Sequence, residues 1–81
     1  MRRMEPRPAA APLASLRKRQ LLSQRDLARR AGVALSTIYL LEAGKTERVT
    51  FKVMRALSQA LDTPAESIAE FRRVIEAERH A

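Results

Sequence analysis

Residues 23–44, SQRDLARRAGVALSTIYLLEAG, carry the pattern that decides the fold. Ser23 is followed three residues later by Asp26, which is the spacing of a capping box at the start of a helix. Gly32 comes one short helix further on. Glycine suits a helix end because it adopts the left-handed backbone without a steric penalty. The segment therefore predicts a short helix that ends at a glycine turn.

A second helix is predicted after this turn, over residues 35–43, with Gly44 as its stop. Ile38 and Leu41 fall on one face of this helix. The small side chain of Ala28 on the preceding helix lets two helices cross closely. The other apolar positions at helical spacing are Leu27, Ala31 and Val33. We therefore expect two short helices that cross beside the turn and pack through these side chains.

This pair of helices and its flanks resemble the helix-turn-helix domain of the phage-repressor and Cro-like (XRE) family. The residues that carry the resemblance are Leu16-Arg17 upstream, Ala28 and Gly32 within the pair, Glu42-Ala43-Gly44-Lys45 at its end, and Ala60-Leu61. The resemblance covers residues 13–68, which is most of the chain. Two helices that merely pack together would explain the leucine and isoleucine positions but not the rest of this set. One departure is Leu21, where the family often has glycine.

The resemblance implies an all-α fold, a five-helix DNA-binding domain of the lambda-repressor type with an extended C-terminal helix. Residues 1–12 would form a flexible basic arm, residues 13–68 the DNA-binding domain, and residues 69–81 a helical extension. The implied function is a sequence-specific transcriptional regulator. Its helix 35–43 would enter the major groove of double-stranded DNA, with the preceding helix across the backbone.

The outward side chains of helix 35–43 are the candidates for base reading, because Ile38 and Leu41 point inward. They are Leu35, Ser36, Thr37, Tyr39 and Leu40. The candidates for backbone contacts are Gln24, Arg25, Arg29, Lys45, Thr46 and Arg48, of which the last two match positions that often touch phosphate in the family. The base-reading set has no Arg, Lys, Asn or Gln, so the side chains that make bidentate base contacts are missing. Leu35 and Leu40 can offer apolar contact to thymine methyl groups. We expect specificity either to be modest or to come from Gln24, Lys45, Arg48 and DNA shape.

The resemblance also places Arg17 opposite Glu42, in a partly buried ion pair that ties the first helix to the third. The alternative is that Arg17 is one more exposed cation in the run Arg17-Lys18-Arg19. The apolar outward face of helix 35–43 leaves a second function open. A domain of this fold can bind a protein, for example as an antitoxin that neutralises a small toxin and regulates its own promoter.

Positive charge is concentrated near the N-terminus. The chain has 16 Lys and Arg against 9 Asp and Glu, a net charge of +7. Nine of the basic and two of the acidic residues fall in residues 1–30, so residues 31–81 are neutral in sum. A one-sided basic region favours a polyanionic partner, nucleic acid before an acidic membrane. Solubility alone is the alternative explanation.

Length and residue usage argue against several other classes. The chain has 81 residues, no cysteine and one histidine, His80, so we expect one small domain without a disulfide, metal site or cofactor. No nucleophile–base pair or glycine-rich phosphate loop suggests an enzyme. No apolar run is long enough to span a bilayer. The basic N-terminus runs into Pro and Ala, so we expect no signal peptide and a cytoplasmic, nucleoid-associated protein.

The remaining helices are expected over residues 13–20, 51–61 and 64–78, the second of them capped by Thr50. Thr63-Pro64-Ala65-Glu66 is typical of a helix start, with a cap, a proline at the first position and a capping-box glutamate. Phe71, Val74 and Ile75 then form an apolar stripe. This stripe either folds back on the core or forms the contact of a homodimer. Residues 62–81 hold five acidic and three basic side chains, which favours a face turned away from phosphate.

Overall fold

The computed structural model describes residues 9–45 and 49–79. These residues form five α-helices and one short 3-10 helix, with a single isolated β-bridge and no strand. The elements are α1 (Leu13–Arg19), α2 (Gln24–Ala31), α3 (Leu35–Glu42), α4 (Phe51–Leu61), η1 (Ala65–Ser67) and α5 (Ala69–Arg79). The predicted all-α class is confirmed for the described part of the chain. The first four helices lie within one residue of their predicted bounds.

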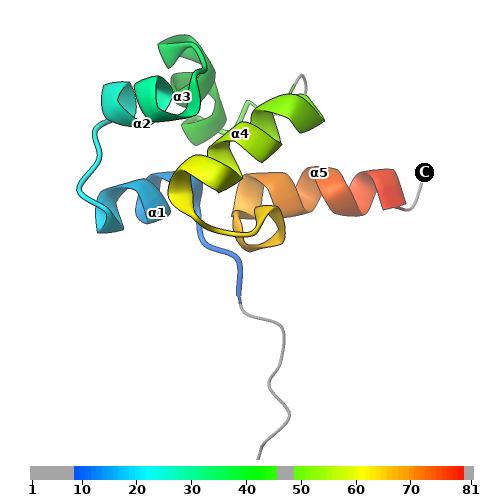
Figure 1. Ribbon diagram of the computed structural model, residues 1–81. Helices are drawn as coiled ribbons and strands as arrows, with labels where there is room; N and C mark the ends of the chain where they lie inside the picture. The colour runs from blue at the N-terminus through cyan, green and yellow to red at the C-terminus, as the bar shows by residue number, and fades with distance from the viewer. Residues whose placement is uncertain (1–8, 46–48, 80–81) are drawn as a thin grey trace, which may run out of the picture.

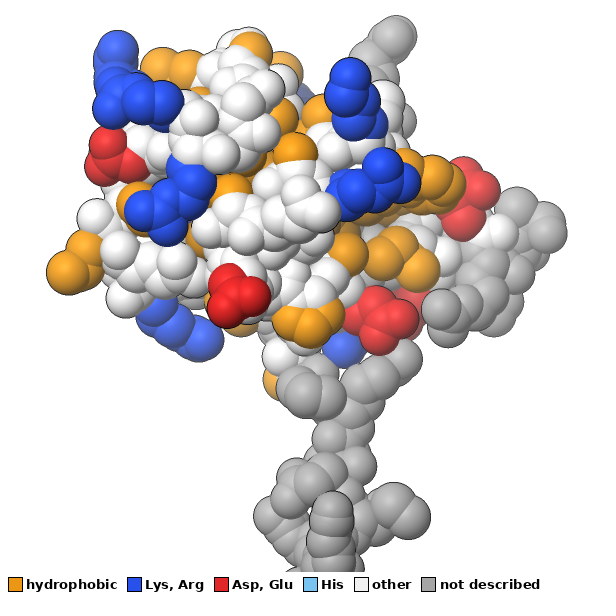
Figure 2. All heavy atoms as spheres, viewed as in Figure 1, with side chains coloured by type: hydrophobic (Ala, Val, Ile, Leu, Met, Phe, Trp, Pro, Cys, Tyr) orange, Lys and Arg blue, Asp and Glu red, His pale blue; other side chains and the backbone are white. Residues whose placement is uncertain are grey.

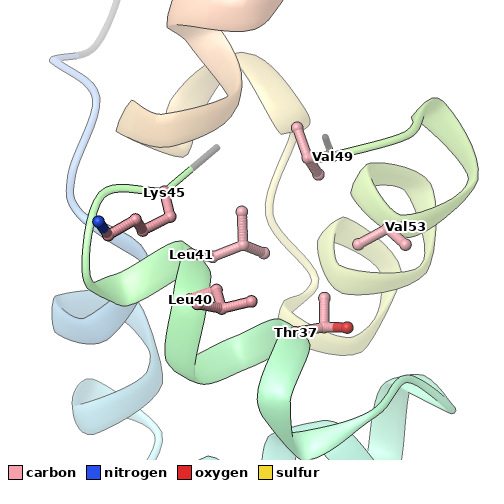
Figure 3. Close-up of a pocket in the computed structure, with 6 residues that line it drawn as sticks. All are labelled: Thr37, Leu40, Leu41, Lys45, Val49 and Val53. Carbon is pink, nitrogen blue, oxygen red and sulfur yellow. The ribbon is translucent and has the colours of Figure 1, made fainter. Parts of the chain in front are cut away.

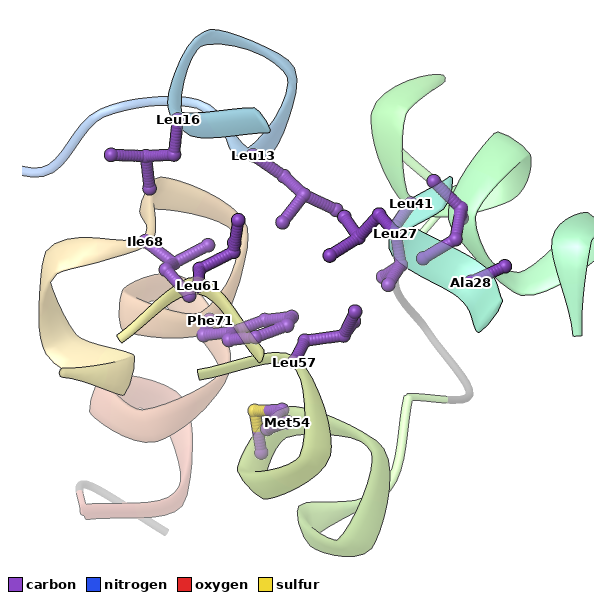
Figure 4. Close-up of a cluster of buried hydrophobic side chains, with 11 residues drawn as sticks. Leu13, Leu16, Leu27, Ala28, Leu41, Met54, Leu57, Leu61, Ile68 and Phe71 are labelled. Atoms are coloured by element: carbon purple, nitrogen blue, oxygen red, sulfur yellow. The ribbon is translucent and has the colours of Figure 1, made fainter. Parts of the chain in front are cut away.

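The helices form two groups on either side of α4. Figure 1 shows α2 and α3 together at one end of the molecule, with α1 and α5 on the other side of the central α4. One apolar core joins the groups, and its fully buried side chains come from every α-helix (Figure 4). They are Leu13, Leu27, Ile38, Leu57, Leu61, Ile68 and Phe71. Because Ile38 is among them, the inner face of α3 is fixed and its other face is turned outward.

A residue with a left-handed backbone follows each of α1 to α4 within two positions. These residues are Leu21 (φ 60°), Gly32 (φ 73°), Gly44 (φ 88°) and Asp62 (φ 51°). After each one, the next N–H bonds back to a carbonyl five positions earlier, at 2.9 to 3.2 Å, which is the Schellman arrangement. Leu21 therefore adopts the same turn that glycine provides after α2 and α3, with the steric penalty that a Cβ brings.

The last helix begins later than the sequence predicts. Pro64 is extended (ψ 144°), η1 follows, and α5 starts only at Ala69. The capping box expected at Thr63 does not form, because the Thr63 hydroxyl donates to the carbonyl of Leu61 at 2.9 Å. The physical reason is Ile68, which is fully buried and extended and forms a parallel bridge with Ala11. A continuous helix would not leave its backbone free for that bridge.

This bridge joins the segment before α1 to the segment before α5. Ala11 N–H donates to Ser67 O at 3.0 Å, and Ala69 N–H donates to Ala11 O at 2.8 Å. The Glu70 carboxylate also accepts from the backbone N–H of Leu13 at 2.9 Å. Pro12 precedes α1 and has no side chain that can cap it, so Glu70 of α5 supplies the missing cap from across the fold.

The expected division into arm, domain and extension is therefore too simple in two places. Ala11, assigned to the flexible arm, is bonded into the fold, whereas residues 1–8 lie outside the described residues. Phe71, for which core packing and a dimer contact are both expected possibilities, is 0% exposed and lies among Leu57, Leu61 and Ile68 (Figure 4). A side chain with no exposed surface offers nothing to a second chain. Of the proposed dimer residues, only Val74 and Ile75 keep some exposure.

Candidate nucleic-acid interface

The start of α2 is built by the capping box that the sequence predicts. The Ser23 hydroxyl accepts from the Asp26 N–H at 2.9 Å, and the Ser23 N–H donates to the Asp26 carboxylate at 3.1 Å. Hydrogen bonding of the Asp26 carboxylate to the backbone N–H of Ser23, and then to its side chain, lowers the pKa of Asp26, with a smaller contribution from the charges of Arg29 and Arg30. The first turn of α2 is thereby fixed, and its remaining N–H groups face outward with the positive end of the helix dipole.

Arg17 holds the ends of three helices together. Its Nε and Nη2 atoms donate to the two carboxylate oxygens of Glu42, at 2.7 and 3.0 Å, and its Nη1 donates to the carbonyl of Leu22 at 2.8 Å. Gln24 adds a bond from its Nε2 to Glu42 at 3.0 Å. The two charged side chains are only 11% and 9% exposed. Such a bidentate, nearly buried pair fixes the end of α3 relative to α1 and α2.

The pKa values of the pair follow from these bonds. Burial raises the pKa of Glu42, but the hydrogen bonds from Arg17 and Gln24 and the charges of Arg17 and Lys18 outweigh it, so the net pKa is lowered. The hydrogen bond to Glu42 raises the pKa of Arg17, against the opposing effect of burial. Both groups are therefore held in their charged forms.

The candidate base-reading residues lie on the outer side of α3. Leu35, Tyr39 and Leu40 are 39%, 62% and 45% exposed, and Ser36 is exposed as well. Thr37 is half-buried, because it faces α4. Apolar side chains thus occupy both faces of this helix, since Ile38 and Leu41 fill the core side. A surface helix with apolar side chains on both of its faces is unusual in a small soluble domain.

A small cavity lies between α3 and α4, and the sequence did not predict it. It has a volume of about 180 Å³ and is lined by Thr37, Leu40, Leu41, Lys45, Val49 and Val53 (Figure 3). Val49 and Val53 form its far wall, at the entry and in the first turn of α4. Val53 lies on the predicted helix 51–61, and Val49 lies just before its cap Thr50. Their four-residue spacing was the one available signal that they share a face.

The candidate backbone-contacting residues surround this face. Arg25, Arg29 and Lys45 are all exposed, and Arg29 lies 4.0 Å from Asp26 on the same helix. Figure 2 shows Lys and Arg side chains spread over the part of the molecule that holds α2, α3 and α4, with hydrophobic side chains between them. An open hollow of about 450 Å³ at the start of α2 is lined by Arg17, Ser23, Gln24, Arg25 and Leu35. Thr46 and Arg48 lie outside the described residues.

Other kinds of site are not found in the described part of the chain. Within residues 9–45 and 49–79, no group of acidic, histidine or cysteine side chains is arranged to hold a metal ion. No helix among these residues has the length and apolar character that crossing a membrane requires. The surface around α3 carries exposed apolar side chains together with exposed basic ones.

A family comparison agrees with this geometry. A sequence model of helix-turn-helix domains matches residues 13–68. No curated protein and no solved structure gives a significant match to the chain. The matched region runs from the start of α1 to the bridging residue Ile68 and includes α2, the Gly32 turn and α3. The chain therefore belongs to the helix-turn-helix family, in its XRE or Cro-like form, whose members are DNA-binding regulators.

Proposed function

We propose that the protein is a sequence-specific transcriptional regulator, most simply a repressor in the cytoplasm, that places α3 in the major groove of duplex DNA. The observation that carries this proposal is that α3 is held in a fixed position and exposes one face. Its inner face is locked by Ile38 and Leu41 and its end by the Arg17–Glu42 pair, while its outer face is open and flanked by cations. A rigid, outward helix between basic side chains matches what a major groove between two phosphate backbones requires.

Phosphate contacts would set the position of the domain on DNA. Arg25 lines a hollow together with Leu35 at the start of α3, and Lys45 lines the cavity beside Leu40. Arg29 is exposed on α2. The N–H groups in the first turn of α2 add a site that favours a phosphate oxygen. Gln24 belongs to the proposed backbone set, and its side-chain amide is held by Glu42. Thr46 and Arg48 complete the set by resemblance to the family.

A salt titration tests DNA binding directly. If about four to six phosphates are neutralised, log K should fall with log salt at a slope of about −4 to −5. Arg25→Gln should make the slope shallower by about one, because one phosphate contact is lost. Arg73→Gln removes the same charge from α5, on the other side of α4, and serves as the matched control. Absence of binding at low salt, or a flat slope, would contradict the proposal.

A second candidate function follows from the exposed apolar residues of α3. Leu35, Tyr39 and Leu40 would suit a protein partner, so an antitoxin or another protein-binding module of this fold is the competing proposal. The two functions differ in one respect. If this face binds a protein, Leu40→Ala should abolish binding of the protein partner and leave DNA affinity nearly unchanged. If the face reads DNA, Leu40→Ala should weaken binding to the preferred DNA site.

We also propose that the regulator acts as a homodimer, because helix-turn-helix proteins commonly read two half-sites about one helical turn apart. Val74 and Ile75 on α5 support it, since each packs partly on the core and keeps some exposed apolar surface. Sedimentation at the concentrations used for DNA binding tests this proposal. A chain that stays monomeric there, alone and on DNA, would contradict it.

A further inference from the structure

The reading face of α3 has an unusual chemistry for a DNA-binding helix. Its exposed residues offer three apolar or aromatic side chains, Leu35, Tyr39 and Leu40, beside the hydroxyls of Ser36 and Thr37. None of them can make the bidentate contacts that arginine makes to guanine or that asparagine and glutamine make to adenine. The face therefore requires a target that presents apolar groups.

The cavity beside α3 extends the same chemistry. Leu40 stands at its edge, Val49 and Val53 form its far wall, and the Thr37 hydroxyl lies at one side (Figure 3). Its volume of about 180 Å³ is below the range of about 300–1,000 Å³ that is typical of sites for whole small molecules. A small apolar group at the surface of a larger ligand suits it better than a free metabolite does.

Charge decides which larger ligand this is. Lys45 lines the cavity, and Arg25 and Arg29 are exposed on the neighbouring helix. Duplex DNA offers apolar groups and negative charge together, because each thymine carries a C5-methyl group into the major groove between two rows of phosphates. A purely apolar protein surface would leave the cations without partners.

We propose that the outer face of α3 reads the C5-methyl groups of thymines in A·T-rich duplex DNA, with Leu35 and Leu40 as the methyl-contacting residues. The inference rests on the proposed DNA-binding function and names its preferred substrate. Ser36 and Thr37 supply hydrogen bonds to the base edges of the same A·T pairs, where adenine N7 and thymine O4 accept and adenine N6 donates. None of these five side chains can make a bidentate contact to guanine, but a single hydroxyl donates to guanine as readily as to thymine, so the A·T preference rests on the methyl contacts.

Replacing thymine by uracil tests the proposal, because it removes the methyl group and keeps every hydrogen-bonding group of the base. A preferred duplex is first selected from a random library, and its thymines are then replaced one at a time. Replacing a contacted thymine by uracil should weaken binding about fourfold, because the burial of one methyl group is lost. Replacement of thymines outside the protected site is the control and should change nothing.

Two variants assign the effect to the leucine face. Leu40→Ala should bind the thymine duplex more weakly and should lose the difference between thymine and uracil at the contacted position. Ser36→Ala should also bind more weakly but keep that difference, because its lost contact is polar. Leu40→Met, which conserves the apolar volume, should keep most of the thymine preference. Leu40 and Ser36 are both exposed, so these variants should fold.

The outcomes separate this inference from the proposed function. Equal affinity for thymine and uracil at every position, or selection of a G·C-rich site, would overturn the methyl-reading proposal and leave DNA binding intact. Absence of duplex binding at low salt would overturn the proposed function itself. A partner protein that requires Leu35 and Leu40 and does not compete with DNA would overturn the inference in favour of a protein-docking face.

Discussion

At the residue scale, Leu21 shows how far the fold can depart from its family pattern. The turn after α1 needs a left-handed residue, and Leu21 takes that role at φ 60° with 91% of its surface exposed. The left-handed backbone costs about 1–2 kcal/mol for a residue with a Cβ. The exposed side chain gains no burial in return. Leu21 is thus a strained position whose strain has no visible function in the described structure.

We therefore predict that Leu21→Gly stabilises the protein. Relief of the steric penalty should exceed the extra chain entropy of glycine, for a net gain of about 0.5–1 kcal/mol. Leu21→Ala is the matched control, because alanine keeps the Cβ and should give no such gain. Urea unfolding of the three proteins measures both effects. Equal stability of the glycine and alanine variants would show that the turn is not strained.

Glu42 gives a prediction on pH dependence at the same scale. Its pKa in the folded state is lowered from the ordinary value near 4.5, mainly because the bonds from Arg17 and Gln24 outweigh burial. A lowered folded pKa adds stability above the unfolded pKa, and this stability is lost as the pH falls through the folded pKa. The protein should therefore become less stable below about pH 4.5, in part through this one group.

Glu42→Gln should remove that contribution. We expect a loss of about 2–3 kcal/mol at pH 7, because Arg17 stays nearly buried without its counter-charge. The difference between the variant and the parent should shrink as the pH is lowered. Glu78→Gln changes an exposed glutamate and should leave the pH profile alone. Identical acid profiles for the parent and Glu42→Gln would mean that Glu42 does not drive the pH response.

At the scale of the elements, α1 depends on α5 for its start. Proline is the N-cap of α1, and the N–H of Leu13 finds its acceptor in Glu70, 57 residues away. Glu70→Ala should cost about 1 kcal/mol, which is typical of a lost helix cap. Glu70→Gln keeps a carbonyl acceptor and should cost less, and Glu78→Ala on the same helix should cost little. Thermal unfolding of the three variants makes the comparison, and a silent Glu70→Ala would rule out the cap.

The elements also show what could be predicted from the sequence. The first four helices and the pairing of α2 with α3 follow from local signals, namely capping residues, glycine turns and apolar spacing. The start of α5 does not, because Thr63-Pro64-Ala65-Glu66 is locally a good helix start. A contact with Ala11, far away in the sequence, holds Ile68 extended instead. Local patterns do not carry information about such long-range backbone bonds.

The same limit applies to the candidate site. The outward residues of α3 could be predicted, since helical periodicity fixes which side faces the core. The cavity with Val49 and Val53 could not, because it depends on how α4 packs beside α3. The role of Phe71 was also open. An apolar stripe on a terminal helix looks alike whether it packs on its own core or on a second chain, and only the packed fold decides between them.

At the scale of the whole molecule, α5 is part of the core rather than an appendage. Phe71 is fully buried, and removing a buried phenylalanine side chain from a core costs about 3–5 kcal/mol of stability. Small domains have total stabilities of about 5–15 kcal/mol, toward the low end for a chain this short. We therefore predict that truncation after Ala69 abolishes cooperative thermal unfolding, as measured by circular dichroism. Truncation after Ala77 keeps Phe71, so this shorter chain should still unfold cooperatively. A cooperatively folding 1–69 fragment would contradict this account of the core.

The most direct test of the central claim compares selected with random DNA for variants of two helices. Ser36→Ala and Thr37→Ala on α3 should each cost about 1–3 kcal/mol on the selected duplex and change affinity for random DNA little, because phosphate contacts remain. Arg25→Ala on α2 should weaken both kinds of DNA to a similar extent. If both of these variants and Leu40→Ala bind the selected duplex as tightly as the parent, α3 does not read bases and the regulator proposal fails.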